Sequence, residues 1–252
     1  LYYANHAAAV LQERGVDLSG MKIAVDCAHG ASCETTPATL RALGAEVFVI
    51  NGDPDGSEIN VGCGSTHLEP VKFLMESRGA DIAIAHDGDA DRMLALAPDG
   101  TVIDGDFLLA ICAKDLKERG LLDNNLVVST VMANLGFQLA MKRESIDVIT
   151  TKVGDRYVLE AMREHGAVLG GEQSGHIIFG RLANTGDGLL TAIKVMEAIT
   201  ETKEPLSVLA SGMTMYPQVL KNVIVTDKDE TLNDEKVKAA VAKAEAELGD
   251  NG

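Results

Sequence analysis

Short apolar segments alternate with helix-patterned segments over most of this 252-residue chain. Such alternation is typical of α/β domains, in which helices cover a sheet that is largely parallel. The turn residues Pro98-Asp99-Gly100 predict a hairpin and so an antiparallel pair within a mixed sheet. We expect strands at 21–27, 46–50, 81–85, 93–97, 101–103, 125–130, 147–150, 168–170 and 176–179. We expect helices at 2–14, 37–43, 68–78, 106–119, 136–143, 157–164 and 188–201.

The alternation restarts near Asp104, which predicts two consecutive three-layer α/β domains at residues 1–103 and 104–216. Beyond Pro217 the pattern changes to one strand (219–226) and one charged helix (234–248). Because one strand and one helix cannot bury a core, we expect residues 217–252 to be the truncated start of a third, α+β domain. The chain also opens on Leu1 rather than Met, so we expect a segment of a longer protein.

Charge and cysteine content narrow the possible partners. A net charge of −16 repels phosphate backbones, so we expect no nucleic-acid partner. The longest apolar run, 107–113, is too short to span a bilayer, and we expect no membrane partner. The four cysteines lack C-x-x-C spacing, which indicates reduced thiols, a cytoplasmic location and no zinc site.

The apolar segment 82–85 runs through His86 into Asp87, Asp89 and Asp91, followed by Arg92. Three carboxylates within five residues repel one another, and a bound cation would relieve that repulsion. Ligand sets made only of oxygen favour Mg²⁺ over zinc or copper. Arg92 adds a planar guanidinium suited to phosphate. The segment therefore predicts a Mg²⁺ site used in phosphoryl chemistry.

This segment has three other interpretations. An EF-hand is disfavoured because Arg92 stands where that loop needs Gly and Pro98 where it needs a bidentate Glu. A phosphatase of the haloacid dehalogenase type also begins with D-x-D after a strand, but Asp91 stands where Thr or Val is usual. The third alternative is an ordinary acidic loop that caps a helix, with no ligand.

Two further loops carry polar side chains suited to a sugar phosphate. In residues 171–176, Glu172 can accept from two hydroxyls, Ser174 can donate or accept, and His176 could exchange a proton with an attacking hydroxyl. A structural histidine and a simple Gly-rich turn are the alternatives. Residues 152–156 offer a phosphate the cations Lys152 and Arg156 and the backbone N–H groups around Gly154. Asp155 could orient either cation. The alternative is that these charges only form a solvated surface.

Polar residues elsewhere are interpreted as structural. Asp187, between two glycines ahead of a long helix, is expected to be an N-cap. We expect His29 and Ser32 to pack and cap after the first strand. His86 is expected to pack or hydrogen-bond beside the aspartates.

Residues 87–92 (Asp-Gly-Asp-Ala-Asp-Arg) and 171–176 (Gly-Glu-Gln-Ser-Gly-His) together resemble the motifs of the α-D-phosphohexomutases. Gln173 and residues 152–157 most resemble the phosphoglucosamine mutases of bacteria within that superfamily. The resemblance extends over residues 1–252 and implies the second domain, the third, and the start of the fourth in a four-domain enzyme.

The resemblance implies a reaction and roles for these residues. It implies that Asp87, Asp89 and Asp91 bind Mg²⁺ and that Arg92 steadies a phosphoserine. The implied reaction interconverts glucosamine 6-phosphate and glucosamine 1-phosphate through a bisphosphate. Arg92, His176 and Lys152 are then catalytic candidates. The substrate-binding candidates are Glu172, Ser174, Gly154, Asp155 and Arg156.

The sequence departs from the family in two places. The family's S-x-S-H-N-type serine loop and its R-x-S-G-T-type phosphate loop are both missing from these 252 residues. The mutase prediction therefore concerns a longer parent, for which a homodimer is an open expectation, and the isolated chain is expected to be inactive. Phosphomannomutase or phosphoglucomutase activity is one alternative, and a non-catalytic module that binds Mg²⁺ and sugar phosphate is another.

Overall fold

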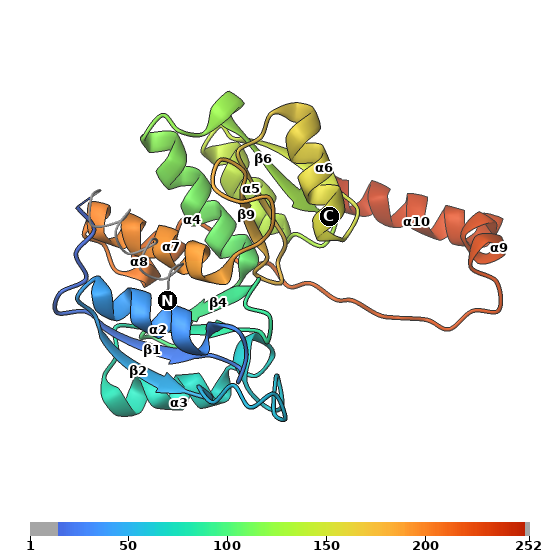
Figure 1. The fold of residues 1–252 in the computed structure, drawn as a ribbon. Helices are drawn as coiled ribbons and strands as arrows, with labels where there is room; N and C mark the ends of the chain where they lie inside the picture. Colours follow the sequence, from blue (N-terminus) through green and yellow to red (C-terminus); the bar gives the residue numbers. More distant parts are fainter. Residues whose placement is uncertain (1–14, 250–252) are drawn as a thin grey trace.

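Two mixed sheets organise the protein in the computed structural model, which describes residues 15–249 (Figure 1). The first sheet has the order β2-β1-β3-β4-β5. Strands β2, β1 and β3 pair in parallel, β4 pairs antiparallel with β3, and β5 pairs antiparallel with β4. Its strands are β1 (Lys22–Asp26), β2 (Glu46–Ile50), β3 (Ile82–His86), β4 (Met93–Leu96) and β5 (Val102–Ile103). The predicted hairpin at Pro98-Asp99-Gly100 is confirmed as the turn between β4 and β5.

Helices cover both faces of this sheet. In Figure 1, α2 (Ser32–Ala42) lies on one side of the strands and α3 (Glu69–Arg78) on the other. Alternate residues of β3 supply both faces, because Ile82 and Ile84 belong to the core cluster on the α2 side and Ala83 and Ala85 to the cluster under α3. A strand buried on both faces explains the apolar run that precedes the three aspartates.

The second sheet repeats this plan with the order β7-β6-β8-β9, in which only β9 is antiparallel. Helices α4 (Gly105–Glu118) and α5 (Leu135–Arg143) contact one face, and α6 (Asp155–His165) covers the other. The strands are β6 (Leu126–Thr130), β7 (Asp147–Thr151), β8 (Leu169–Gly171) and β9 (Ile177–Phe179). The prediction of two consecutive α/β units with mixed sheets is confirmed.

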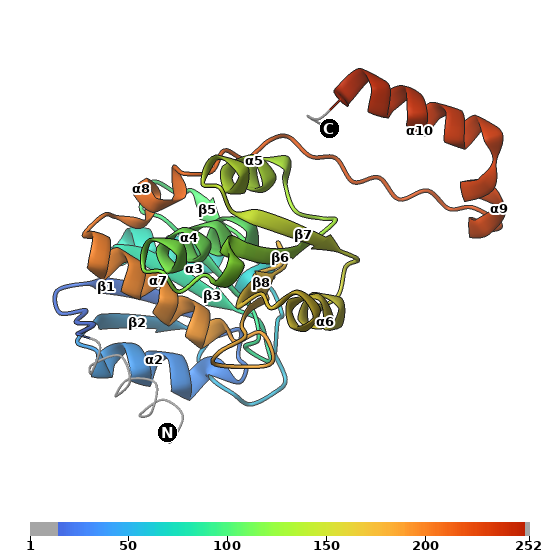
Figure 2. The same ribbon diagram turned by 90° about the horizontal axis from the view of Figure 1, so that it is seen from above.

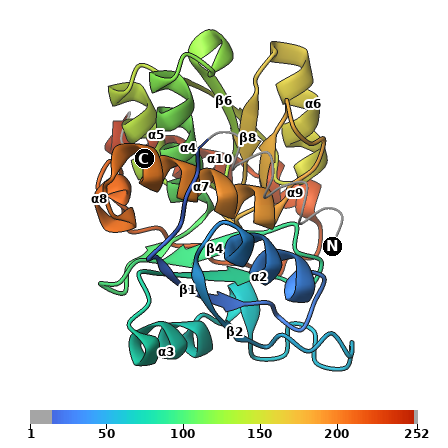
Figure 3. The same ribbon diagram turned by 60° about the vertical axis from the view of Figure 1, so that its left-hand side comes forward.

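One helix joins the two units into a shared core. Helix α7 (Gly188–Thr202) follows the second sheet but contacts α2 and β4 of the first unit as well as α4 of the second. Figure 3 shows it between the two sheets. Its residues from Gly188 to Ala198 are buried except Leu190, and one buried cluster continues from Val16 to Met213. The N-terminus of α7 is thereby brought to the end of β3.

Helix boundaries differ from prediction in a few places. Proline is favoured in the first helical turn, so residue 37 was expected near the start, but α2 begins at Ser32 and contains Pro37. The short elements η1 (Gly64–Thr66), η2 (Asp123–Asn125), α8 (Leu206–Ala210) and α9 (Lys228–Asn233) were not predicted. The helix predicted at 2–14 lies outside the described residues.

The strand predicted at 219–226 is wrong. No described strand pairs with these residues, and their apolar side chains are open to solvent, with Val219 91% and Ile224 101% exposed. Residues with strand propensity do not form a strand by themselves, because the backbone N–H and C=O groups of an extended segment need a neighbouring strand to pair with. The predicted charged helix is confirmed as α10 (Glu235–Leu248), and Figure 2 shows α9 and α10 apart from both sheets. Within residues 15–249 no helix combines the length and apolarity needed to cross a bilayer.

Candidate functional site

The acidic loop (residues 87–92) connects β3 to β4 and brings its three aspartates together. One carboxylate oxygen each from Asp87, Asp89 and Asp91 lies within 4.8 Å of the others. The Arg92 Nε lies 3.8 Å from Asp87 and 3.8 Å from Asp91. The guanidinium thus supplies one positive charge to a cluster of three negative charges, and a net negative charge remains.

Burial makes this cluster electrostatically costly. Burial and the negative charges of Asp91 and Asp89 together raise the pKa of Asp87 to about 7, although the hydrogen bond from the Arg92 backbone N–H opposes the change. The Asp91 Oδ1 atom is buried and has no hydrogen-bond partner among the described residues, and its nearest cation is the Arg92 Nε at 3.8 Å. An orphaned carboxylate oxygen beside two others fits a hard cation, because Mg²⁺ and Ca²⁺ take oxygen ligands.

The acidic loop is held by backbone contacts from three directions. Ala31 N–H donates to Gly88 O at 2.8 Å and Gly188 N–H donates to Ala90 O at 2.9 Å, and directly after the loop Met93 N–H, at the start of β4, donates to Gly175 O at 3.2 Å. These contacts come from the loop after β1, from the start of α7 and from the second unit. The loop geometry is therefore set by both units rather than by its own residues alone.

Two buried histidines contact this loop. His86 Nδ1 lies 3.1 Å from the Arg92 carbonyl and its Nε2 lies 3.1 Å from the Thr36 hydroxyl. Burial lowers the pKa of His86 to about 4, so the neutral ring donates from Nδ1 and accepts at Nε2. His176 Nδ1 lies 3.1 Å from Asp91 Oδ2. The expectation that His86 packs and hydrogen-bonds beside the aspartates is confirmed.

The GEQSGH loop (residues 171–176) joins β8 to β9 and faces the acidic loop. Gly175 has φ +92°, and a Cβ there would lie 2.3 Å from the Met93 carbonyl oxygen. Gly105 N–H donates to the Gln173 carbonyl at 2.9 Å. Ser174 is exposed, whereas His176 is buried. The close approach of Gly175 to the Met93 carbonyl requires glycine, and it joins the GEQSGH loop to the end of the acidic loop across the two units.

The KVGDR loop (residues 152–156) follows β7 and runs into the first turn of α6, and it contacts the GEQSGH loop through one hydrogen bond. Gly154 N–H donates to Glu172 Oε1 at 2.9 Å. Lys152 is exposed. The Glu172 carboxylate therefore links these two loops, and a chain of contacts runs from Asp91 through His176 to residue 154.

Arg156 does not follow the expectation that Asp155 orients it. Its guanidinium Nε donates to Glu160 Oε1 at 2.8 Å, and Asp155 Oδ1 accepts from the Arg156 backbone N–H at 2.7 Å. The i,i+4 spacing of Arg156 and Glu160 on α6 explains this pairing and was visible in the sequence. Asp155 thus satisfies a free N–H of the first helical turn.

Asp187 is confirmed as the N-cap of α7, because its Oδ1 accepts from Leu190 N–H at 2.9 Å. The glycines on either side of it have a role that the sequence analysis missed. Gly186 N–H donates to His176 Nε2 at 3.0 Å, and a Cβ at Gly188 would lie 2.6 Å from His86 Nδ1. The Gly-Asp-Gly spacing was the available signal for such close backbone approach.

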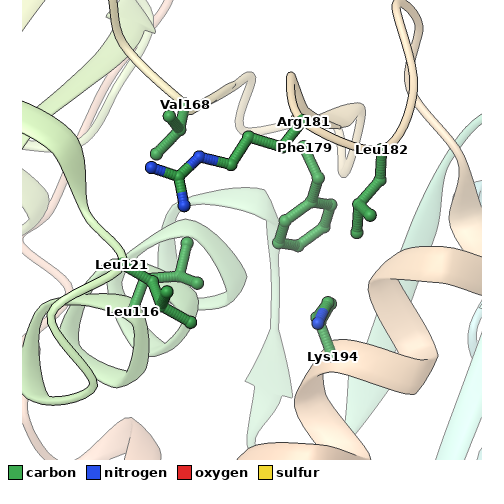
Figure 4. A pocket seen from close by; sticks show the side chains of 7 residues that line it. All are labelled: Leu116, Leu121, Val168, Phe179, Arg181, Leu182 and Lys194. Carbon is green, nitrogen blue, oxygen red and sulfur yellow. The ribbon is translucent and has the colours of Figure 1, made fainter.

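Hollows elsewhere are less suited to an anionic ligand. A cavity of about 100 Å³ lies between α4, α7 and β9, and Figure 4 shows its mainly apolar lining. Its two cations already have acidic partners, since Arg181 contacts Asp123 and Lys194 contacts Glu197, each at 2.6 Å. A more open hollow of about 590 Å³ borders Gln173 beside the segment that follows α8.

Comparison with known proteins relates this arrangement to one family. Residues 2–100 match the family model of phosphoglucomutase/phosphomannomutase, alpha/beta/alpha domain II, and residues 104–216 match domain III. A phosphoglucosamine mutase from Symbiobacterium thermophilum is 50% identical over 242 residues, which are 96% of this chain and 54% of that protein. The chain spans about half the length of the curated relatives it matches.

Solved structures share the fold. A phosphoglucomutase/phosphomannomutase family protein from Burkholderia thailandensis superposes with a TM-score of 0.72 at 27% identity, over 83% of this chain and 45% of that one. An N-acetylphosphoglucosamine mutase from Aspergillus fumigatus, solved with GlcNAc-6P and magnesium, gives 0.67 at 20% identity, over 86% of this chain and 50% of that one.

Proposed function

This chain belongs to the phosphoglucomutase/phosphomannomutase family, and from that membership we propose that it is the Mg²⁺-binding and sugar-binding part of a phosphoglucosamine mutase. The proposed reaction interconverts glucosamine 6-phosphate and glucosamine 1-phosphate through a phosphoserine and a bisphosphate. The observation that carries the proposal is the cluster of three aspartates, with its orphaned Asp91 oxygen, hydrogen-bonded to the GEQSGH loop of the second unit.

We propose the following division of roles among the residues. Asp87, Asp89 and Asp91 would hold Mg²⁺, which when bound supplies positive charge to a transferring phosphoryl group. Arg92 lies 3.8 Å from two of these carboxylates and would add a second positive charge toward the same phosphate. Oxygen-only donors and the residual negative charge of the cluster support this assignment.

The substrate contacts are proposed on the two loops of the second unit. Glu172 and Ser174 would hydrogen-bond sugar hydroxyls, and Lys152 would face a phosphate, whereas the Gly154 N–H is engaged by Glu172 and would position that carboxylate. The Glu172 carboxylate already accepts from Gly154 N–H, which keeps the two loops at hydrogen-bond distance. Asp155 and Arg156 are proposed in supporting positions, because their polar groups bond to α6 itself.

The division of the chain is likewise a proposal. Residues 1–103 would form the second domain of the parent enzyme, residues 104–216 the third, and residues 217–252 the start of the fourth. Matches at 2–100 and 104–216 support the first two limits. A cytoplasmic location is proposed from the four free cysteines.

The isolated chain should bind glucosamine 6-phosphate with Mg²⁺ but should not convert it. The GEQSGH and KVGDR loops are present, whereas the family's serine loop and its R-x-S-G-T-type phosphate loop are both missing from these 252 residues. Phosphorus NMR of the chain with glucosamine 6-phosphate, its bisphosphate and Mg²⁺ measures both the binding and the conversion of the substrate. Glu172→Gln should weaken binding about tenfold through loss of a charged acceptor, and Glu164→Gln, exposed on α6, should leave it unchanged.

Three results would contradict the proposal in different ways. Conversion by the isolated chain would mean that the missing loops are dispensable. Release of phosphate from p-nitrophenyl phosphate would favour a phosphatase. Equal binding by the Glu172→Gln and wild-type chains would remove the GEQSGH loop from the sugar site.

A further inference from the structure

Two exposed apolar side chains flank Gly154 in and beside the KVGDR loop. Val153 is 55% exposed and Tyr157 is 46% exposed. Tyr157 belongs to the first turn of α6, but it lies outside the buried side of that helix, which includes Val158 and Met162. The aromatic ring therefore contributes little to the core of the second unit, and it is available to a ligand at the edge of the sheet.

The ring of Tyr157 lies against the backbone of residue 154. A Cβ at Gly154 would lie 3.3 Å from Cδ2 and 3.7 Å from Cε2 of the ring, and the φ of +130° at this residue favours glycine. The Tyr157 N–H also donates to the Gly154 carbonyl at 3.0 Å, within the first turn of α6. Glycine at position 154 therefore lets the ring approach the loop backbone closely.

The same glycine contacts the proposed sugar-binding carboxylate. Gly154 N–H donates to Glu172 Oε1 at 2.9 Å, so Tyr157 and Glu172 both contact residue 154. The neighbouring Arg156 is directed along the helix, because its Nε donates to Glu160 Oε1 at 2.8 Å. An exposed aromatic ring thus stands beside the loops whose polar groups would hold the sugar.

A sugar phosphate needs two kinds of contact. Its hydroxyls and its phosphate require polar partners, whereas the C–H groups of the pyranose ring present an apolar surface. Binding sites for small molecules combine apolar and aromatic side chains with a few polar groups that fix the orientation of the ligand. Tyrosine suits such a site because its ring offers a large contact area at a small cost in conformational entropy. The Tyr157 ring provides this apolar surface next to Glu172, the acceptor proposed for sugar hydroxyls.

We propose that Tyr157 is a further substrate-contacting residue, whose ring packs against the C–H groups of the sugar while Glu172 accepts hydrogen bonds from the sugar hydroxyls. The inference rests on the proposed function, because it takes a hexosamine phosphate as the ligand of the GEQSGH and KVGDR loops. It assigns the sugar part of the substrate to Tyr157 and leaves the phosphate to the cationic groups.

Two substitutions separate the ring from its hydroxyl. Tyr157→Phe keeps the ring, and Tyr157→Leu keeps only an apolar side chain. Chemical-shift titration should show glucosamine 6-phosphate binding about 3- to 10-fold weaker in Tyr157→Leu and within about twofold of wild type in Tyr157→Phe. Inorganic phosphate, which lacks the sugar, should bind equally to all three chains. Phe73, which is 73% exposed on α3 of the first unit, gives the matched control Phe73→Leu, and this variant should bind the sugar phosphate as wild type does.

Proton NMR locates the contact in the wild-type chain. The chain has four tyrosines, so selective labelling of their rings gives few signals, and the Tyr157→Phe spectrum identifies the signal of Tyr157. A nuclear Overhauser effect should connect the sugar C–H protons to the Tyr157 ring when the chain is saturated with glucosamine 6-phosphate and Mg²⁺. Saturation without this effect would overturn the proposal. The measurement also decides the question if Tyr157→Leu does not fold.

The outcomes distinguish this inference from the proposed function. If the wild-type chain binds no glucosamine 6-phosphate, the proposed sugar site fails. If wild type binds it and Tyr157→Leu binds it equally well, only the role of Tyr157 fails. Equal weakening in Tyr157→Leu and Tyr157→Phe would assign the contact to the hydroxyl. Equal weakening toward inorganic phosphate would show a general disturbance of the loop, and either of these two results would overturn the ring contact.

Discussion

Replacing Asp87 with asparagine is expected to stabilise the metal-free chain by about 2 to 4 kcal/mol at pH 8 and to weaken its Mg²⁺ binding by more than about tenfold. The folded state raises the pKa of Asp87 from 3.8 to about 7, mainly through burial. The folded chain therefore holds this proton more tightly than the unfolded chain. Stability is lost as the pH rises from about 4 to about 7, and the neutral amide avoids that loss.

Urea unfolding with EDTA at pH 5 and pH 8 measures this effect. The gain from Asp87→Asn should be present at pH 8 and small at pH 5, and saturating Mg²⁺ should reverse the order by stabilising wild type. Burial also raises the pKa of Asp106 to about 7, but that contribution is common to both proteins and cancels. Asp147→Asn, exposed on the second sheet, is the control for removing a charge. An equal gain in the free energy of unfolding at both pH values would contradict the assignment of the pH-dependent loss of stability to Asp87.

Replacing Gly105 with alanine is expected to destabilise the chain by about 3 kcal/mol or more, at the upper end of overpacking costs. A Cβ there would lie 1.9 Å from the Glu172 carbonyl oxygen and 2.6 Å from the Gly175 nitrogen, and both are backbone atoms. The start of α4 and the GEQSGH loop would have to separate. Mg²⁺ affinity should fall as well, because this loop carries the donor to Asp91.

Gly212→Ala is the matched control for this substitution. Its added Cβ would meet the Leu209 carbonyl oxygen at an ordinary 3.5 Å, so its free energy of unfolding should change by less than about 1 kcal/mol. Urea unfolding of both variants measures the difference. A Gly105→Ala chain as stable as the Gly212→Ala chain would show that α4 and the GEQSGH loop do not need this close approach.

The parts of the fold predicted correctly depend on local patterns. Strand β3 and the three aspartates lie within eleven residues, so the period of the strand and the spacing of the carboxylates were readable directly. The N-cap Asp187 was predicted for the same reason, because its acceptor role involves a residue three positions along the chain. Such local signals place a carboxylate cluster at the end of a strand.

The parts that were not predicted depend on contacts between distant residues. His176 and Asp91 are 85 positions apart, and the Gly105 contact with Glu172 depends on how α4 packs against a loop 67 positions further along the chain. The strand predicted at 219–226 failed for a related reason, since pairing requires a partner that no local pattern supplies. Sequence reasoning therefore named the candidate residues of the site, and the structure shows which of their atoms are already engaged.

Electron paramagnetic resonance of Mn²⁺, used as a substitute for Mg²⁺, tests the central claim most directly. We predict one Mn²⁺ bound per chain, displaced by Mg²⁺, with binding lost in Asp89→Asn. Binding should be retained in Asp99→Asn, whose side chain accepts from Thr101 N–H in the exposed turn after β4. A wild-type chain that binds no Mn²⁺, or an Asp89→Asn chain that binds it with unchanged affinity, would contradict the account.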